Sequence, residues 1–584
     1  AAMQNTMSIT SMLDGKRITE SICLYSFNET GGYIFSSRHL TMGWTKMESG
    51  EGAFPSQIKP SHPSDATTWW YLPYDQLNLD LLPGQESIGI ILIESEKQAK
   101  RRPYHKQKLC YILSNMRHFA IETLSKGIPV VYVATSEQYD EPLRALAQEF
   151  GPINMHRAAE RELRLTLSEL VVEGLIVEHP HPGWLTPQDW FTETVGNEPP
   201  FRMDRFYRRV RKEKGWLMEG DSPVGGKFSH DADNRQPWKG EHQPPQAPEY
   251  SIDEIDEEVI AFVNDRFAEH PGEARLNHLP TTYDDHRKAL DFLSDILTLF
   301  GPYEDAMTKE SRGLFHSRLA SSVNIHRILP QEVIDVVVQA KVPLNSQEGY
   351  LRQMIWREYV HHVHEVTDGF HLLDVNTTTP PNRTAGWQVQ LEEDDTAHPN
   401  HLKQTKPLPM AYWGQSSGMD CLDWAVESVM DEAWTHHIPR LMVLSNLAQL
   451  MDIEPRQLTD WFHAAFIDAF DWVVEPNVLG MGTFALGDAM MTKPYVSGSP
   501  YIKKMGDFCS SCEFHPAKTC PISPMYWAYF ERHKDAFAGN HRLAMTLRTL
   551  AKRSDEKKQI DQETFEHVTR TLGEGKSLAS QTKL

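Results

Sequence analysis

The chain has 584 residues, 40% of them hydrophobic and 24% charged, a composition typical of a soluble globular protein with two or more domains. The formal net charge of −22 argues against a protein that coats nucleic acid nonspecifically, although a local basic groove is compatible with that sum. No apolar run reaches the ~18–20 residues of a membrane span and no secretory signal is evident, so we expect a cytoplasmic monomer without a membrane partner.

The first half of the chain predicts an α/β domain. Residues 1–65 are rich in Ser, Thr, Gly and Met, and we interpret them as an N-terminal extension. After them, short apolar runs typical of buried parallel strands alternate with helical stretches. The expected strands are Trp69–Pro73, Ile88–Glu94, Val130–Thr135 and Leu175–Val177, and the expected helices are Lys106–Lys126, Pro142–Phe150 and Ala158–Val171. This alternation predicts a doubly wound parallel sheet over residues 66–180, without a GxGxxG dinucleotide signature after its first strand.

The remainder of the chain predicts a second, all-α domain. Residues 181–250 hold many Pro, Gly and charged positions and are interpreted as an interdomain linker. Within them, Phe201–Lys214 carries seven Arg or Lys against two acids, which fits either a solvated helix face or phosphate contacts. Helical periodicity dominates residues 251–584, so the fold class is an α/β domain joined to a large helical domain.

Four cysteines form a candidate metal site. Cys509, Cys512 and Cys520 lie within twelve residues, and Cys421 is the natural fourth ligand. Four thiolates suit either zinc or an iron–sulfur cluster. A Cys-x-x-Cys pair is also a redox dithiol pattern, but no βαβ pattern follows this one. The spacing therefore predicts a metal site and leaves zinc and a cluster open.

A series of motifs carries a family resemblance. In chain order they are Gly226–Ser229 (GKFS), Leu314–Ser317 (LFHS), Glu348–Gln353 (EGYLRQ), Trp356–Tyr359 (WREY), His436–Met442 (HHIPRLM), Pro476–Met481 (PNVLGM) and Lys493–Met505 (KPYVSGSPYIKKM). The last of these runs directly into the cysteine cluster. Together they resemble the iron–sulfur bacterial cryptochromes and photolyases, also called deoxyribodipyrimidine photolyase-related proteins, over roughly residues 67–550.

The resemblance implies the photolyase/cryptochrome fold and three bound groups. These are FAD in the helical domain, a 4Fe–4S cluster on the four cysteines and, in many members, 6,7-dimethyl-8-ribityllumazine as an antenna in the α/β domain. By the family pattern, the FAD-binding residues are His316, Ser317, Arg352, Gln353, Arg440 and Asp468. Arg440 and Asp468 would form a charge pair beside the isoalloxazine, where a positive group favours the anionic reduced flavin. A purely structural ion pair is the alternative.

The same resemblance assigns catalytic roles to two histidines and two tyrosines. A flipped (6-4) lesion needs a hydroxyl moved between bases, and a histidine with a near-neutral pKa can supply and retrieve the proton. His437 is the expected proton-transfer residue and His436 its assistant, whereas Tyr495 and Tyr501 would line the cavity that receives the bases. Without the motif, these side chains would be interpreted as core or capping residues.

Two further pairs complete the implied site residues. Trp461 and Trp413 match positions that carry electrons to the flavin in relatives, although either can serve in packing alone. Asp75 and Gln76 match the antenna motif, in which Tyr74 replaces the usual glycine. His361, His362, His364 and Glu365 look like metal ligands but lack the HExxH spacing, so we interpret them as a solvated helix end.

One departure from the family pattern concerns the flavin itself. The residue expected to face its N5 atom is Val474, with Glu475 next along, where relatives often have an acid. The intact set of His436, His437, Tyr495 and Tyr501 favours light-dependent repair of (6-4) photoproducts in UV-damaged DNA, which is the activity we expect, whereas the change at Val474 and the N-terminal extension favour a receptor. The alternative is a blue-light photoreceptor, a cryptochrome without repair activity that signals through a partner.

Overall fold

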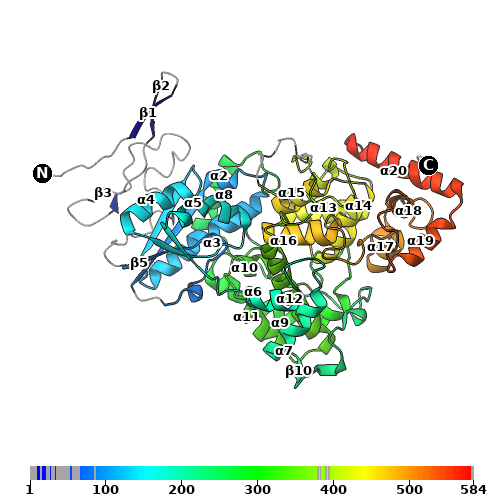
Figure 1. The fold of residues 1–584 in the computed structure, drawn as a ribbon, viewed down its shortest axis with the longest axis horizontal. Coiled ribbons are helices and arrows are strands. Elements are labelled where there is room, and N and C mark those ends of the chain that lie inside the picture. Colours follow the sequence, from blue (N-terminus) through cyan, green and yellow to red (C-terminus); the bar gives the residue numbers. More distant parts are fainter. Residues whose placement is uncertain are drawn as a thin grey trace.

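The computed structural model describes residues 66–84, 87–377, 381, 383–387, 391 and 395–579, the pair 53–54, and the backbone of four short strands. Those strands are β1 (Ile9–Leu13), β2 (Lys16–Glu20), β3 (Ser26–Phe27) and β4 (Tyr33–Ile34). The rest of the expected N-terminal extension lies outside the described residues. In Figure 1 the α/β domain (blue to cyan) and the helical domain (green to red) lie side by side.

A five-stranded parallel sheet forms the centre of the α/β domain. Its strands are β5 (Thr68–Tyr71), β6 (Ile88–Ser95), β7 (Val130–Thr135), β8 (Ile153–His156) and β9 (Ile176–His179), in the order β7-β6-β5-β8-β9. The helices among them are α2 (Glu96–Ala99), α3 (Lys106–Ser125), α4 (Asp140–Phe150) and α5 (Arg161–Val172). All eight residues of β6 are buried, as expected for a central parallel strand. The predicted doubly wound sheet is confirmed; β8 was missed because its four residues (INMH) form no apolar run.

The segment expected to be a linker contributes to the helical core. It contains α6 (Gln188–Thr194) and α7 (Met203–Lys214), and a short hairpin of β10 (Met218–Glu219) and β11 (Ser222–Pro223). Phe191 and Phe206 are fully buried and pack with the large apolar cluster of the helical domain. The polar face of α7 is largely occupied by ion pairs such as Arg208–Asp204 and Arg209–Glu193, which supports the solvated-face interpretation. Residues 181–250 are therefore more than a connection.

The next helix belongs to the other domain. Helix α8 (Glu254–Arg266) packs on α3, and its Val259 and Val263 are fully buried in the core of the α/β domain. The helical domain continues with α9 (Tyr283–Tyr303), α10 (Ala320–Asn324), α11 (Pro330–Gln339), α12 (Leu344–Val366), α13 (Asp420–Glu432), α14 (Asn446–Leu450), α15 (Pro455–Ala465), α16 (Asp471–Glu475), α17 (Ser499–Met505), α18 (Ile522–Arg532), α19 (Ala544–Ala551) and α20 (Asp555–Gly573). No helix in the described part of the chain combines the length and apolarity that a membrane crossing requires.

Candidate functional site

A charge pair lies at the centre of the helical domain. The wide π-helical turn Pro439–Ser445 presents Arg440, which donates two hydrogen bonds of 2.9 Å to the carboxylate of Asp468. The Arg440 Nε atom donates to the carbonyl of Thr435 at 2.7 Å, and Phe466 lies 4.4 Å beneath the guanidinium. The expected pair is present, in the bidentate geometry that fixes both groups.

Three histidines from two segments of the chain lie near Arg440, and burial together with the charge of Arg440 lowers their pKa values. The ring of His316 stacks on that of His436 with centroids 4.2 Å apart, and His437 meets His316 edge-on at 5.3 Å. Burial lowers the pKa of His316 and of His436 well below the usual value, so both rings are neutral near pH 7. Neither ring nitrogen of His436 has a hydrogen-bond partner, nor does Nε2 of His316. Buried polar atoms without partners indicate a ligand or water site.

The expected proton-transfer residue faces a carboxylate. The Nε2 atom of His437 lies 3.9 Å from Asp305, and the hydroxyl of Tyr501 donates to the same carboxylate at 3.3 Å. Desolvation, opposed by Asp305, lowers the pKa of His437 to about 4, although 39% of its side chain is exposed. The imidazole is therefore neutral near pH 7, in contrast to the near-neutral pKa expected from the sequence. Tyr495 lies at the rim with 38% of its surface exposed.

The two polar residues of α12 expected near FAD are held by acids. Arg352 lies 3.1 Å from Asp231, and Gln353 donates to Glu304 at 2.6 Å. The Nε and Nη2 atoms of Arg352 make no hydrogen bond, but they lie 3.6 Å from Glu348 and 3.7 Å from Glu304, so three carboxylates surround this guanidinium. Ser317 is bound instead to the hydroxyl of Tyr350 at 2.7 Å.

The tryptophans form a longer row than the sequence indicated. Trp461 is completely buried and its ring centroid lies 6.3 Å from that of Trp413. Trp387, which is partly exposed, continues the row at 4.7 Å from Trp413. Sequence reasoning missed Trp387 because it lies in a polar stretch without a family motif. The three rings connect the core of the helical domain with its surface.

The four cysteines come together as expected. Cys421 of α13 and the three C-terminal cysteines line one small cavity whose other walls include Met419, Ile502, Phe508, Phe514 and Ile522. All four are free thiols. Burial raises the pKa of Cys421 well above the usual value, and the other three thiols raise it further. Four convergent thiols in an apolar wall fit a tetrahedral metal or a cluster, which would bind them as thiolates.

A second cavity, which we call the α/β cavity, lies between the α/β domain and the helical domain, near the carboxyl ends of β5 and β6, where doubly wound sheets usually bind ligands. Its lining consists of Tyr74, Ile93, Glu94, Ser95, Gln98, Ala99, Tyr104, Lys108, Leu109, Ile112, Leu113, Met116, Tyr139, Glu160, His463, Ala469 and Phe470. Tyr74 donates to Glu160, whereas Lys108 donates to the carbonyls of His463 and Ala469 at 2.8 and 2.6 Å. The expected antenna residues Asp75 and Gln76 are fully buried nearby but are not part of the lining.

Comparisons with known proteins identify the family. A family model described as deoxyribodipyrimidine photo-lyase-related protein matches residues 71–278. A (6-4) photolyase of Agrobacterium fabrum is 30% identical over 487 residues, which cover 80% of this chain and 91% of that protein. The chain belongs to the deoxyribodipyrimidine photolyase-related family. Among solved structures, a bacterial class III photolyase from Agrobacterium tumefaciens matches with a TM-score of 0.49 and 14% identity over 88% of this chain and 99% of that chain. A cryptochrome of Synechocystis matches with a TM-score of 0.47 and 15% identity, over 75% of this chain and 86% of that chain.

One acid of this photolyase-related protein is committed to a buried network. Glu475 accepts hydrogen bonds from Arg456 at 2.7 Å and pairs with His364 at 2.9 Å. Burial alone would raise the pKa of Glu475, but Arg456 and His364 lower it to about 2. Glu475 is therefore a fixed anion, next to the buried Val474.

The histidines at the end of α12 are buried. They are His361, His362 and His364, and their interpretation as a solvated helix end was wrong. Helix α12 is enclosed on almost every side, so its sequence has only a weak amphipathic pattern, and that pattern did not indicate that these histidines are buried.

Proposed function

We propose that this protein is a light-dependent (6-4) photolyase that holds FAD in the helical domain. One observation carries the proposal: three neutral histidines, two of which have unpartnered ring nitrogens, lie together near Arg440 of the Arg440–Asp468 pair. Support comes from the relative named a (6-4) photolyase, which aligns over most of both chains. The bound flavin would supply a light-driven electron donor for the lesion.

The chain's own residues fit such a cofactor. Arg440, fixed by Asp468 and Phe466, places a positive charge that cannot swing away. The nitrogens of His316 and His436 gain partners only when a polar molecule enters, which makes occupation favourable by removing unsatisfied groups.

His437 would handle the proton at the lesion. Its neutral ring can accept a hydrogen bond from the hydroxyl that must move between the two bases. Asp305 lies on the other side of the ring and favours the protonated form. An anionic lesion would raise the pKa of His437 from about 4 toward neutrality, so substrate binding itself would prepare the general acid.

UV-damaged DNA would approach over the rim marked by Tyr495. Arg235 and Arg542 lie close enough to Tyr495 to lower its pKa against the raising effect of burial. Such cations suit the phosphates beside a flipped lesion, and binding should weaken as salt increases. Flipping costs a few kcal/mol and least at damaged bases, which favours the lesion over intact thymines.

The four cysteines would hold a 4Fe–4S cluster. Support comes from their convergence on one apolar cavity and from the family resemblance. Iron and acid-labile sulfide in equal amounts, about four each per chain as the cluster formula requires, would support the assignment. Zinc without sulfide would contradict it. Cys512→Ser should reduce the bound metal.

The α/β cavity would hold the ribityllumazine antenna. Tyr74, Tyr104 and Tyr139 offer aromatic faces for its ring. Asp75 and Gln76 lie outside this lining, so the tyrosines and not the two motif residues would contact the antenna. Mass spectrometry of the chromophores released by denaturation tests this assignment.

The decisive experiment is repair of an oligonucleotide carrying one (6-4) photoproduct. Reduced protein under blue light should convert the photoproduct to intact thymines, which chromatography detects. The same protein kept in the dark should leave the photoproduct unchanged. A blue-light photoreceptor is the second candidate, favoured by the commitment of Glu475 to Arg456 and His364. Absence of repair by protein that contains photoreducible flavin would contradict the photolyase and leave the photoreceptor.

A further inference from the structure

A second group of stacked aromatic rings lies beside the flavin site, apart from the row of Trp461. Trp472 of α16 is buried and meets Trp184 edge-on, with centroids 5.0 Å apart. Trp184 is partly exposed and stacks on His361 at 3.6 Å with an interplanar angle of 4°. These rings therefore also connect the core with the surface.

This group is linked to the charge pair by hydrogen bonds. Asn324 donates to the carbonyl of Asp468 at 2.8 Å, and it accepts from Nε of Arg357 at 3.0 Å. The guanidinium of Arg357 lies over both indoles, 4.5 Å from the ring of Trp184 and 4.9 Å from that of Trp472. Trp472 is thus only two side chains away from the Arg440–Asp468 pair and, by sequence, four residues from Asp468.

The position of this cation opposes electron donation. When an indole gives one electron to a photoexcited oxidised flavin, it becomes a radical cation, and a positive charge a few ångströms away raises the free energy of that product. Burial lowers the pKa of Arg357 to about 10, which leaves it charged near pH 7. Its neighbour Glu358 lies 3.4 Å away, but burial raises the pKa of that carboxyl to about 7, so the charge of Arg357 is only partly balanced.

The row of Trp461 lacks such a charge. Of the arginines and lysines that lie over aromatic rings among the described residues, none lies over Trp461, Trp413 or Trp387. Both rows have ring spacings short enough for electron transfer between neighbours. The difference between them is the guanidinium held between two of the rings.

We propose that Arg357 keeps Trp472 and Trp184 from donating electrons, so that photoreduction uses the Trp461 row alone. This inference rests on the proposed flavin function. One electron would pass from an indole to the photoexcited flavin and leave an indole radical cation. An external thiolate would then give one electron to that radical and restore the indole, and two of the resulting thiyl radicals would combine to a disulfide. Arg357 acts through its charge on neighbouring rings and is a positioning residue, not a catalytic one.

The test measures photoreduction, by loss of the flavin's visible absorbance under blue light with a thiol present. The first measurements are the flavin content and the photoreduction rate of the unaltered protein, and Trp461→Phe should slow that rate at least tenfold. Protein without flavin, or a Trp461→Phe variant with an unchanged rate, would count against the proposed function. If both results are as expected, the double variant Trp461→Phe/Arg357→Met should be photoreduced severalfold faster than Trp461→Phe, and adding Trp472→Phe should remove this gain.

Arg357→Lys in the Trp461→Phe background is the matched control, because it keeps the charge and should recover nothing. Equal recovery with lysine, or none with methionine at full flavin content, would overturn the inference. Trp472→Phe in the otherwise unaltered protein provides a second measurement that does not depend on the folding of an Arg357 variant. It should leave the photoreduction rate unchanged, and a slower rate would show that the second row is already in use.

Discussion

The histidine cluster of the helical domain (His316, His436 and His437) and the α/β cavity are both formed by aromatic and ionisable side chains, but the two sites differ in how their polar atoms are satisfied. In the histidine cluster, both ring nitrogens of His436 and Nε2 of His316 have no hydrogen-bond partner. In the α/β cavity, the hydroxyl of Tyr74 is bound to Glu160, and the ammonium group of Lys108 is bound to two carbonyls. A polar ligand gains hydrogen bonds at once at the histidine cluster, whereas in the α/β cavity it must compete with bonds that already exist.

This difference indicates which of the two sites depends on a bound ligand for its stability. The histidine cluster gives up stability by leaving these nitrogens without partners, and a bound cofactor would return that stability by mass action. The α/β cavity is self-sufficient, so its occupant can be lost with little effect on the fold. An essential cofactor in the first and an optional antenna in the second are consistent with this division.

The largest effect is expected from breaking the central charge pair. Arg440→Ala leaves the carboxylate of Asp468, which is only 4% exposed, without its partner. Such a change costs about 3–5 kcal/mol of unfolding free energy and should abolish flavin retention. Denaturant unfolding and the flavin content of the purified protein measure both consequences.

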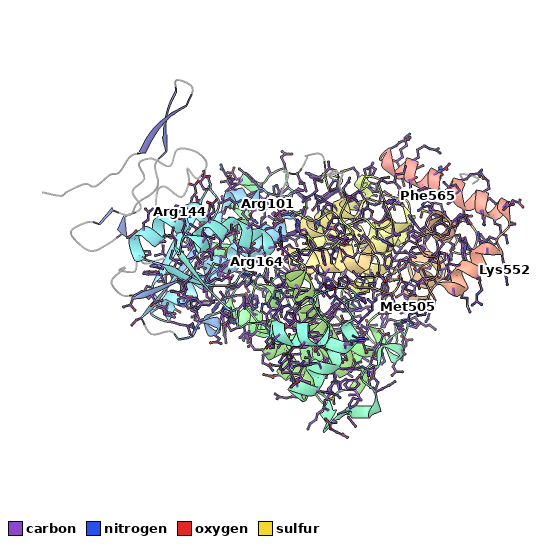
Figure 2. The ribbon with its side chains drawn as sticks, in the orientation of Figure 1. Arg101, Arg144, Arg164, Met505, Lys552 and Phe565 are labelled. Carbon is purple, nitrogen blue, oxygen red and sulfur yellow. The ribbon has the colours of Figure 1, made fainter. Side chains whose placement is uncertain are left out.

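The matched control is a pair on the other domain. Arg144 of α4 pairs with Glu173 at the surface, where both side chains are about 40% exposed, and Figure 2 labels Arg144 in the α/β domain. Arg144→Ala should leave the free energy of unfolding almost unchanged and the flavin in place, because exposed ion pairs contribute little. Equal effects of the two substitutions would contradict the special role of the central pair.

The next effect concerns the lesion chemistry. His437→Ala should lower the repair rate at least ~100-fold, since general acid–base groups contribute factors of this order. Flavin content and photoreduction should not change, because His437 lies toward Asp305 and Tyr501, away from the tryptophan row. Single-turnover repair of the photoproduct measures the loss.

His541→Ala is the control for that substitution, because His541 is exposed. Its repair rate should equal that of the unaltered protein. Retention of full repair by His437→Ala would move the proton-transfer role to another residue, and His436 would be the next to test.

Much of this site followed from the sequence, and the failures have identifiable causes. Arg440 and Asp468, and Cys421 and Cys509, are distant in the chain, yet the family motifs paired them correctly. Asp305 was missed because it stands in an ordinary loop sequence and acquires a role only through its contact with His437. The low pKa of His437 was also missed, because it results from the burial of the ring among its tertiary neighbours, which no sequence motif encodes.

The strand β8 and helix α12 show the same limit at the level of the fold. Four residues with little apolar pattern became a strand because parallel neighbours on both sides supplied hydrogen bonds. The histidines of α12 became buried because helices enclose it on nearly every side, and amphipathicity reports one-sided burial only. Local pattern thus failed where tertiary packing overrode it.

Acid should reveal the dependence of the fold on neutral histidines. Burial lowers the pKa of His437 to about 4 and that of His326 to about 3, below the value of about 6.5 in an unfolded chain. The unfolded state therefore binds more protons below pH ~6.5, and the stability that these rings contribute is complete above that pH and is lost toward pH ~4.

Thermal unfolding and flavin release should accordingly both become easier as the pH falls from 6.5 to 4. His326→Gln, which removes one titrating ring, should flatten the pH dependence of unfolding. A melting temperature that is constant over this window would contradict the neutral state of these histidines.

The smallest effect is expected in the α/β cavity. Tyr74→Phe removes the hydroxyl that donates to Glu160, while the amide of Asp471 continues to donate to that carboxylate at 3.3 Å. The loss of one hydrogen bond to a charged group costs about 1.5–3 kcal/mol, and the remaining donor should keep the cost near the lower limit. Flavin content and repair under direct excitation should be unchanged, with Tyr283→Phe, which alters an exposed ring, as the control. Release of flavin by Tyr74→Phe would mean that the α/β cavity and the flavin site are energetically coupled. The distinction between an essential site and an optional one would then be wrong.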